Sequence, residues 1–398
     1  MKRKTTAAAF TTAGSAGLAS LLITVIMVGL GERIGERFLP VYLVAAGATL
    51  FAPSVLNALD NFLSAVYSIP GGWVSTKFGY KKALLYFNIF AILGYLIVII
   101  FPGWLSVIIG SVFFLSWSSL SMPACMDLIQ QELPKNRQVM GVSIHSLIKR
   151  VPMALGPVLG GVLIDTFGIT NGIRLAFIIA VVLGLLAIVV QQLALKNTIT
   201  PEVKEQGLPR ILPWHFPRGM QIILVSDILA KICSQIPYAY VAIWAMEYAQ
   251  GAHISATQFG ILTGIEMAFA IFVYIPVAFL GDKFKRKGFI QTTFVLYTIF
   301  PVLLFLGRNF WLLLIAFIVR GLKEFGEPTR KIQIMSLAPE NQKALYFGAY
   351  YFFRDVIVTG GVFLGGWLWL VKPELNLLVS MLFGLSAVLL YGLAGKSE

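Results

Sequence analysis

The chain has 398 residues, of which 58% are hydrophobic and only 12% are charged, and its formal net charge is +13. Charged residues are about half as frequent as in soluble domains, so the composition excludes a soluble globular protein and indicates a membrane protein. The same scarcity of charge excludes a broad phosphate-binding surface, so the basic excess does not predict a nucleic-acid partner.

Twelve stretches of the sequence are long and apolar enough to cross a bilayer, for which about 20 residues are needed. The first half of the chain contains 17–43, 55–74, 83–101, 105–126, 139–164 and 173–195, and the second half contains 220–248, 259–280, 289–306, 311–337, 345–370 and 375–393. We therefore expect an all-α membrane protein with twelve transmembrane helices whose outer faces contact the lipid bilayer.

Lysine and arginine are concentrated in alternate loops. The loops after the even-numbered spans are basic, whereas the other loops and their borders contain only Arg174, Arg308 and Lys372. Because cytoplasmic loops carry the excess of Lys and Arg, we expect both termini in the cytoplasm and a multi-pass location in the plasma membrane, the inner membrane of a bacterium.

The two halves of the chain carry related patterns. A shift of 206 residues places Asp60 on Glu266, and a shift of 205 places Lys149 on Arg354. The second shift also places the glycines of helix 5 on glycines of helix 11, namely 156, 160 and 161 on 361, 365 and 366. Such a repeat predicts two pseudo-symmetric six-helix bundles, 1–195 and 219–398, joined by a cytoplasmic linker at 196–218.

Three short motifs carry a family resemblance. Residues 72–81, Gly-Trp-Val-Ser-Thr-Lys-Phe-Gly-Tyr-Lys, are similar to the G-x-x-x-D-R-x-G-R-R motif of the major facilitator superfamily, with Thr76 in place of the acid. A second copy at 278–287 keeps the acid as Asp282. Residues 156–161 resemble the G-P-x-x-G-G motif of the antiporters in that family, and 321–331 resemble a segment of members whose substrate is unassigned.

The resemblance implies the twelve-helix fold of that superfamily, with a cavity lined by helices 1, 4, 7 and 10 of a single monomeric chain. It also implies a gating role for the motif residues, which are Gly72, Lys77, Gly79, Lys81, Asp282, Lys283, Gly156, Pro157, Gly160 and Gly161.

Within the predicted spans we assign sixteen charged residues to membrane depth, where each costs at least about 2.5 kcal/mol on insertion scales. The candidates for substrate binding or coupling among them are Glu32, Arg33, Glu36, Arg37, Asp60, Lys149, Asp227, Lys231, Glu266, Arg320, Glu324, Glu327, Arg354 and Asp355, and the other two are Arg150 and Lys323. Acidic and basic residues are equally frequent in this set, which predicts ion pairs around a polar cavity.

Helical spacing predicts four pairs within single helices. Asp227 with Lys231, Arg320 with Glu324, and Lys323 with Glu327 stand at i, i+4, and Arg33 with Glu36 stands at i, i+3. Such pairs either lock helices together or take part in transport, and the sequence leaves both open.

Asp60 and Glu266 have no partner on their own helices. We expect them to be proton sites or partners of basic groups on helices 5 and 11. His145 lies one turn before Lys149 on helix 5, and helix packing is favoured over a proton relay for it.

Motifs of enzymes and of primary pumps are missing from the sequence. It has no phosphate-binding loop with the required spacing, no His-Glu-x-x-His zinc motif and no Gly-x-Ser-x-Gly elbow. Its two cysteines, Cys125 and Cys233, suggest neither a disulfide framework nor a metal site. We therefore expect no enzyme activity, no cofactor and no bound metal.

Together these features predict a secondary active transporter that works by alternating access. Its expected partners are protons and a small polar, charged or amphipathic solute, for which a zwitterionic or anionic class is favoured. The helix 5 motif favours export by proton antiport. Proton-coupled uptake by symport, and a receptor or sensor built on a transporter fold, are the alternatives.

Overall fold

The computed structural model describes residues 16–115, 117–132, 138–195, 212–248, 250–280, 286–339 and 342–395. Within these ranges every regular element is helical. Nine described helical stretches are by themselves long and apolar enough to cross a membrane. The longest of them turns back at Gly168 and supplies two spans, and two pairs of shorter helices supply two more, which confirms the twelve-helix prediction.

The first six spans are built from eight helices. They are α2 (Ala16–Glu36) with α3 (Leu39–Ala45), α4 (Ala52–Val66) with α5 (Ser68–Phe78), α6 (Tyr80–Ile100), α7 (Trp104–Phe114) with α8 (Trp117–Glu132), and the two arms of α9 (Gln138–Ala194). The turn in α9 is at Gly168, whose φ of 78° is a left-handed conformation that glycine adopts without steric cost.

The last six spans follow a short helix, η2 (Pro213–His215), and repeat the breaks of the first half except in α12, which is continuous where its equivalent is divided into α4 and α5. They are α10 (Arg218–Tyr238) with α11 (Val241–Met246), α12 (Ala256–Leu280), α13 (Arg286–Leu306), α14 (Phe310–Leu322) with η3 (Lys323–Gly326) and α15 (Glu327–Leu337), α16 (Lys343–Val371) and α17 (Pro373–Ala394). The α14–α15 span contains a 3₁₀ turn at η3, next to glycines at both ends of that turn.

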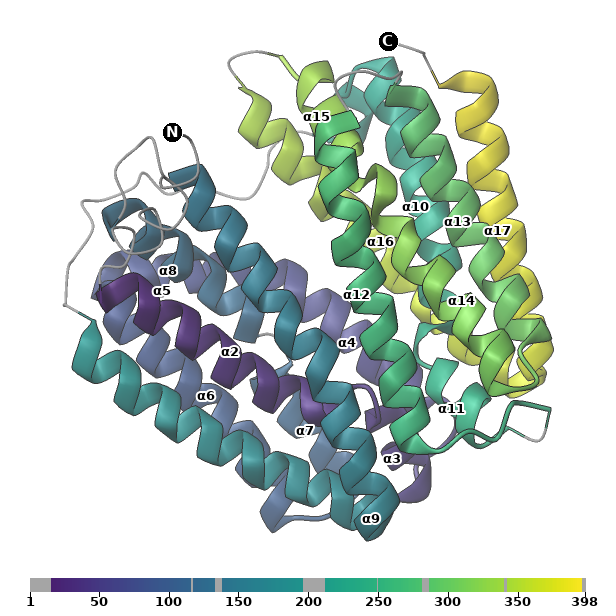
Figure 1. Ribbon diagram of the computed structural model, residues 1–398. Coiled ribbons are helices and arrows are strands. Elements are labelled where there is room, and N and C mark those ends of the chain that lie inside the picture. The colour runs from purple at the N-terminus through teal and green to yellow at the C-terminus, as the bar shows by residue number, and fades with distance from the viewer. Residues whose placement is uncertain are drawn as a thin grey trace, which may run out of the picture.

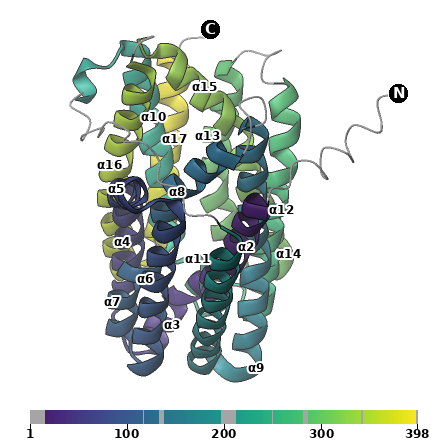
Figure 2. The same cartoon turned by 90° about the vertical axis from the view of Figure 1, so that its left-hand side faces the viewer.

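Helices α2–α9, the first half, lie side by side, and so do helices α10–α17, the second half (Figure 1). The halves join along two seams, where α9 packs against α12 and α4 packs against α16. The first half, in purple to teal, and the second half, in teal-green to yellow, converge near α3 and α11 and diverge toward α15 (Figure 1). Figure 2 shows α3 and α15 at opposite ends of the bundle. Because the number of spans is even, α2 begins and α17 ends at the same end of the bundle; we call it the terminus end, and the opposite end the far end.

Glycines at matching positions of the repeat allow close packing both within each half and at the two seams. A Cβ atom on Gly160 would overlap the carbonyl oxygen of Ile34 on α2, and one on Gly161 would overlap that of Ala256 on α12. The corresponding Gly365 and Gly366 of α16 face Ile236 on α10 and residues Phe51 and Ser54 at the start of α4. Each half therefore uses one glycine for its own bundle and the next for the opposite half.

Polar contacts join the halves near the far end. The hydroxyl of Tyr240 lies 2.8 Å from that of Ser54 and donates to the carbonyl oxygen of Leu50 at 2.9 Å. Asn57 donates to Gln235 at 3.2 Å. At the other seam, the backbone N–H groups of Ala256 and Thr257 donate to the carboxylate of Asp165 at 3.0 and 2.8 Å.

Candidate functional site

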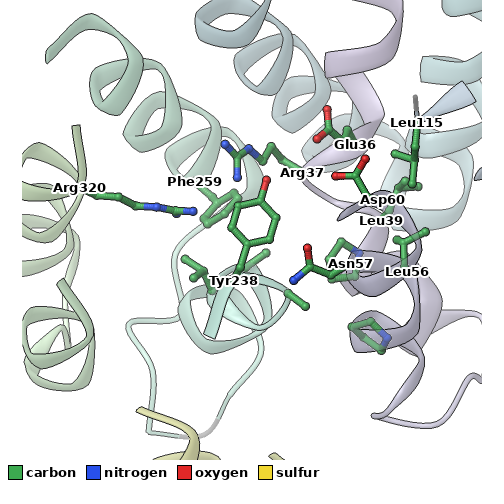
Figure 3. A pocket seen from close by; sticks show the side chains of 15 residues that line it. Glu36, Arg37, Leu39, Leu56, Asn57, Asp60, Leu115, Tyr238, Phe259 and Arg320 are labelled. Atoms are coloured by element: carbon green, nitrogen blue, oxygen red, sulfur yellow. The ribbon is translucent and has the colours of Figure 1, made fainter. Parts of the chain in front are cut away.

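A pocket lies between the halves, just inside these far-end contacts (Figure 3). The empty space between its lining atoms, counted together with adjoining open solvent, is about 540 Å³. Its lining residues are Glu36, Arg37, Leu39, Pro40, Pro53, Leu56, Asn57, Asp60, Leu115, Tyr238, Ala239, Val241, Ala242, Phe259 and Arg320. Both halves contribute, and besides the four helices that we expected, α4 and α12 also line the space. We call it the central pocket.

Two of the charged groups in the central pocket are held by ion pairs. Glu36 is paired with Arg33, whose guanidinium also lies 3.2 Å from Glu32. Arg320 is paired with Glu266 at 3.3 Å, and both residues are buried. The partner of Glu266 therefore comes from α14, not from helix 5 or helix 11 as we expected.

The other two charged groups of the pocket, Arg37 and Asp60, have no such partner. Among the described residues, no acidic oxygen lies within 4 Å of the Arg37 guanidinium and no basic nitrogen lies within 4 Å of the Asp60 carboxylate. Figure 3 shows Arg37 beside Tyr238, with Asp60 next to Glu36 on the opposite side of the pocket. The pocket thus offers one unpaired positive group and one unpaired negative group.

Two guanidinium groups from opposite halves lie near the ring of Tyr238. The Arg37 guanidinium carbon lies 5.1 Å from the centroid of the Tyr238 ring, and that of Arg320 lies 5.4 Å from it. Arg320 also lies 4.9 Å from the ring of Phe300. Cation–π attraction to the tyrosine allows two positive groups to approach each other inside an apolar protein.

A second charge network lies within the second half, where α10, α15 and α16 meet. Asp227 is fully buried and accepts from Arg330 at 2.5 Å, from the Tyr350 hydroxyl at 3.0 Å and from Arg354 at 3.4 Å. Arg330 also pairs with Glu327. Arg354 reaches Asp355 at 2.7 Å. Every acid of this network has a basic partner, so its geometry is that of a structural lock.

The predicted pairs at i, i+4 are replaced by other pairs, between helices for Asp227 and Arg320 and within α15 for Glu327. Asp227 pairs with Arg330 and Arg354 rather than with Lys231, and Arg320 pairs with Glu266 rather than with Glu324. Glu327 pairs with Arg330 and Lys331 rather than with Lys323. The physical reason for the last two is the 3₁₀ turn at Lys323–Gly326, which changes the helical register that the prediction assumed. The pair of Arg33 with Glu36 is confirmed.

Three predicted lysines have other surroundings. Lys231 and Lys323 lie 5.8 and 5.5 Å from the centroid of the Tyr297 ring, on different helices. Lys149 lines a second pocket in the first half together with Glu32, Arg33 and His145. His145 is buried, and no hydrogen-bond partner faces its Nδ1 atom in the described part of the chain. A further pair links the halves at mid-height, with Glu324 3.5 Å from Arg150.

The predicted gating residues separate into two places. Gly72, Lys77 and Gly79 lie in or directly after α5 at the terminus end, where Lys77 lies 4.6 Å from the Trp73 ring centroid. Lys81 donates to the carbonyl oxygen of Gln192 at 2.8 Å. Asp282 and Lys283 lie outside the described residues. Gly156 and Gly160 of α9 pack against α2 in their own half, and Pro157 and Gly161 pack against α12 at the seam between the halves.

Sequence reasoning missed several residues of these sites. Tyr238, Tyr350 and Arg330 were not among the candidates, although Arg330 lies within the predicted span 311–337 and is only 1% exposed. Its position three residues after Glu327 was an available signal. No feature of the sequence distinguishes Tyr238 from the other tyrosines, fourteen in all, as the ring near Arg37 and Arg320. Within the described residues, no group of three or more His, Cys, Asp or Glu side chains is arranged to hold a metal ion.

Comparison with known proteins identifies the family. The model of the Major Facilitator Superfamily matches residues 5–248 and again residues 228–396, which together include nearly the whole chain. The chain belongs to the Major Facilitator Superfamily. The fold class and the resemblance inferred from the short motifs are thereby confirmed.

A curated relative and several solved structures are similar to this member of the superfamily. An uncharacterized MFS-type transporter of Methanocaldococcus jannaschii is 26% identical over 270 residues, which are 62% of this chain and 64% of the relative. A nucleoside transporter, NupG, has a TM-score of 0.78 at 10% identity and covers 96% of this chain and 100% of its own.

A peptide transporter, POT, in complex with sulfate has a TM-score of 0.75 at 14% identity, with coverage of 96% and 94%. A bacterial homolog of the human lysosomal transporter Spinster, in an inward-facing and occupied conformation, has a TM-score of 0.74 at 12% identity, with 96% of both chains covered. At these identities the structural likeness establishes the fold alone.

Proposed function

We propose that this protein is a secondary active transporter that exchanges protons for a small charged solute by alternating access. The observation that carries the proposal is the unpaired carboxylate of Asp60 in a pocket between the two halves. A carboxylate in this position can hold a proton or a positively charged group of a solute, but not both. That competition is the physical basis of antiport.

The arrangement of the halves supports alternating access. They are joined at the far end by hydrogen bonds and by the close approach of glycines, and they diverge toward the terminus end (Figure 1). Under the positive-inside rule the terminus end is cytoplasmic, so the pocket is closed to the outside and faces inward. A rocking motion that breaks the far-end contacts would expose the same pocket to the other side.

Glu32 is the second candidate for a proton site. Its side chain is 1% exposed and 3.2 Å from Arg33, and no hydrogen-bond donor faces either carboxylate oxygen in the described part of the chain. It lines the second pocket with Lys149 and His145, one helical turn from Glu36 in the central pocket. Protonation of Glu32 would leave Glu36 as the only charged partner of Arg33 among these two acids. The balance of charge at the central pocket would then change.

The direction that we propose is export, driven by protons that enter from outside. It rests on the similarity of residues 156–161 to the motif of the antiporters and on the contact of this segment with both α2 and α12. A segment that touches its own bundle and the opposite half is placed to act during rocking. Uptake by symport would require that the proton and the solute bind together, which competition at Asp60 opposes.

Reconstitution into liposomes with an imposed pH gradient tests this proposal. We expect the influx of protons to drive solute in the opposite direction, and we expect Asp60→Asn to abolish this coupling while Glu32→Gln weakens it. Glu247→Gln, an exposed acid beyond α11, is the matched control and should behave as the unchanged protein. Full pH-driven flux in both the Asp60 and the Glu32 variants would refute the assignment. Solute binding without flux in either direction would instead favour a receptor.

A further inference from the structure

The charged residues of the central pocket indicate the charge class of the solute, because two of them are held in ion pairs within the described part of the chain and two are not. Of the four charged residues that line it, Glu36 and Arg320 are already neutralised by Arg33 and Glu266. The Arg320 and Glu266 pair is nearly fully buried, so it is costly to break. These two residues therefore belong to the framework of the pocket.

Arg37 and Asp60 remain for a ligand. The guanidinium of Arg37 is held in place by Tyr238 at 5.1 Å, and stacking on a ring leaves the N–H groups in the guanidinium plane free to donate. Such a planar donor fork matches the two oxygens of a carboxylate. Asp60 faces the same pocket from α4 and offers two acceptor oxygens, which suit an ammonium group.

The walls between these two groups are apolar. Leu56, Leu115 and Phe259 are buried side chains that line the pocket, and Leu39 and Val241 extend this surface. A solute with an apolar body would bury its surface here, while a highly hydrated sugar-like body would leave polar groups without partners.

We infer that the solute is a small zwitterion with an apolar body, whose carboxylate binds Arg37 and whose ammonium group binds Asp60. This inference rests on the proposed transport function and narrows its substrate to one charge class. A solute with a single positive charge would leave Arg37 unpaired in a buried site, and a solute with a single negative charge would leave Asp60 unpaired. Either case costs binding free energy, so both ionic classes are rejected by the same two residues.

Equilibrium binding to the purified protein, without any gradient, tests the charge class separately from transport. The probes share one skeleton: L-leucine is the zwitterion, L-leucine methyl ester is the cation and N-acetyl-L-leucine is the anion. Leucyl-leucine and 6-aminohexanoate extend the distance between the two charges. At neutral pH we expect one or more of the zwitterions to bind, and the ester and the acetylated compound to bind roughly tenfold more weakly or worse.

Two variants should shift the charge preference of binding in opposite directions. Loss of a residue with a purely structural role would not produce such a pattern. Asp60→Asn should lose the zwitterion but accept the acetylated anion at least as well as the unchanged protein does. Arg37→Gln should lose the zwitterion and gain preference for the ester. Retained binding of the matched ion shows that each variant is folded. Glu247→Gln and Arg218→Gln, which change exposed charges outside the pocket, should keep the original preference.

The outcomes separate the two proposals. Binding of cations or anions in preference to every zwitterion, failure of all the zwitterions to bind, or equal losses for all probes in both variants would overturn the inference. pH-driven flux of another charge class would leave the proposed transport function intact. Binding of zwitterions without pH-driven flux would uphold the charge class and refute the proton coupling.

Discussion

Arg330 and Arg37 show how the surroundings decide the role of a charged residue at membrane depth. Arg330 is 1% exposed and is held between Asp227 and Glu327, so its charge is neutralised inside the protein. Arg37 lies against a tyrosine ring and faces a pocket without an acidic partner within 4 Å in the described part of the chain. The first arrangement stabilises the fold, and the second is available to a ligand.

Loss of Arg330 should therefore reduce stability rather than change specificity. Arg330→Met leaves the buried Asp227 with the hydroxyl of Tyr350 and the longer contact to the basic Arg354, and removal of one partner from a buried pair typically costs about 3–5 kcal/mol. We expect a clear drop in the midpoint of thermal unfolding in detergent. The double change Asp227→Asn with Arg330→Met should recover part of the loss, since it leaves no unpaired acid.

Lys331→Met is the matched control for this experiment. Lys331 contacts the same Glu327 at 3.6 Å, but its side chain is 43% exposed, and exposed pairs contribute about 0–1 kcal/mol. An equal loss of stability in the Arg330 and Lys331 variants would contradict the assignment of the Asp227 network as a structural lock.

At the scale of helices, the spans were predictable and the pairing of charges was not. Long apolar runs identify a span wherever they occur, because a membrane requires every backbone polar group to be satisfied within a helix. The partner of Asp227 depends on how α10, α15 and α16 pack against one another. The spacing of residues along one helix holds no information on that packing. The 3₁₀ turn at Lys323–Gly326 also separates residues that an unbroken helix would pair.

The candidate site was predictable to the same extent. Charge at membrane depth marked Arg37 and Asp60, and the repeat marked Asp60 together with Glu266. Neither signal could show that Glu266 is neutralised by Arg320 while Asp60 has no basic partner within 4 Å among the described residues. That difference arises from α14, whose Arg320 reaches Glu266 on the neighbouring α12.

The close packing of α9 against α2 should tolerate no side chain at position 160, which is a glycine. A Cβ atom there would overlap the carbonyl oxygen of Ile34, and backbone on α2 cannot move without displacing Arg33 and Glu36. We expect Gly160→Ala to lower transport strongly. Gly360→Ala is the control, because that glycine of α16 faces open space and alanine favours the helix by about 0.5–1 kcal/mol. Normal transport by the Gly160 variant would contradict the close packing of α2 against α9.

For the whole molecule, the contacts at the far end determine which side of the pocket is open. The carboxylate of Asp165, on α9, accepts from the first two N–H groups of α12 in the opposite half. This contact caps a helix across the interface, and a negative group at a helix N-terminus is also favoured by the helix dipole. In the proposed alternating-access cycle, this contact must break before the pocket opens at the far end.

Asp165→Ala should therefore shift the population toward the state that is open at the far end. Loss of a cap costs about 1 kcal/mol, which corresponds to roughly a fivefold shift. Spin labels on the exposed Phe167, beside the turn of α9, and on the exposed Gln258, in the first turn of α12, would report it as a larger fraction of long distances. Thr166→Ala, which removes a hydroxyl bonded only to Val162 of its own helix, should leave the distances unchanged. No shift in the Asp165 variant would show that its cap does not hold the halves together.

In the proposed mechanism, a proton and the solute compete for Asp60 in the pocket between the halves. The decisive measurement is proton release on binding of the tightest zwitterion to the purified protein, followed with a pH indicator in weak buffer. We expect about one proton to be released per solute bound at a pH where Asp60 is protonated in the free protein. We also expect Asp60→Asn to abolish this release and Glu247→Gln to preserve it. Binding without proton release, or with proton uptake, would contradict this mechanism.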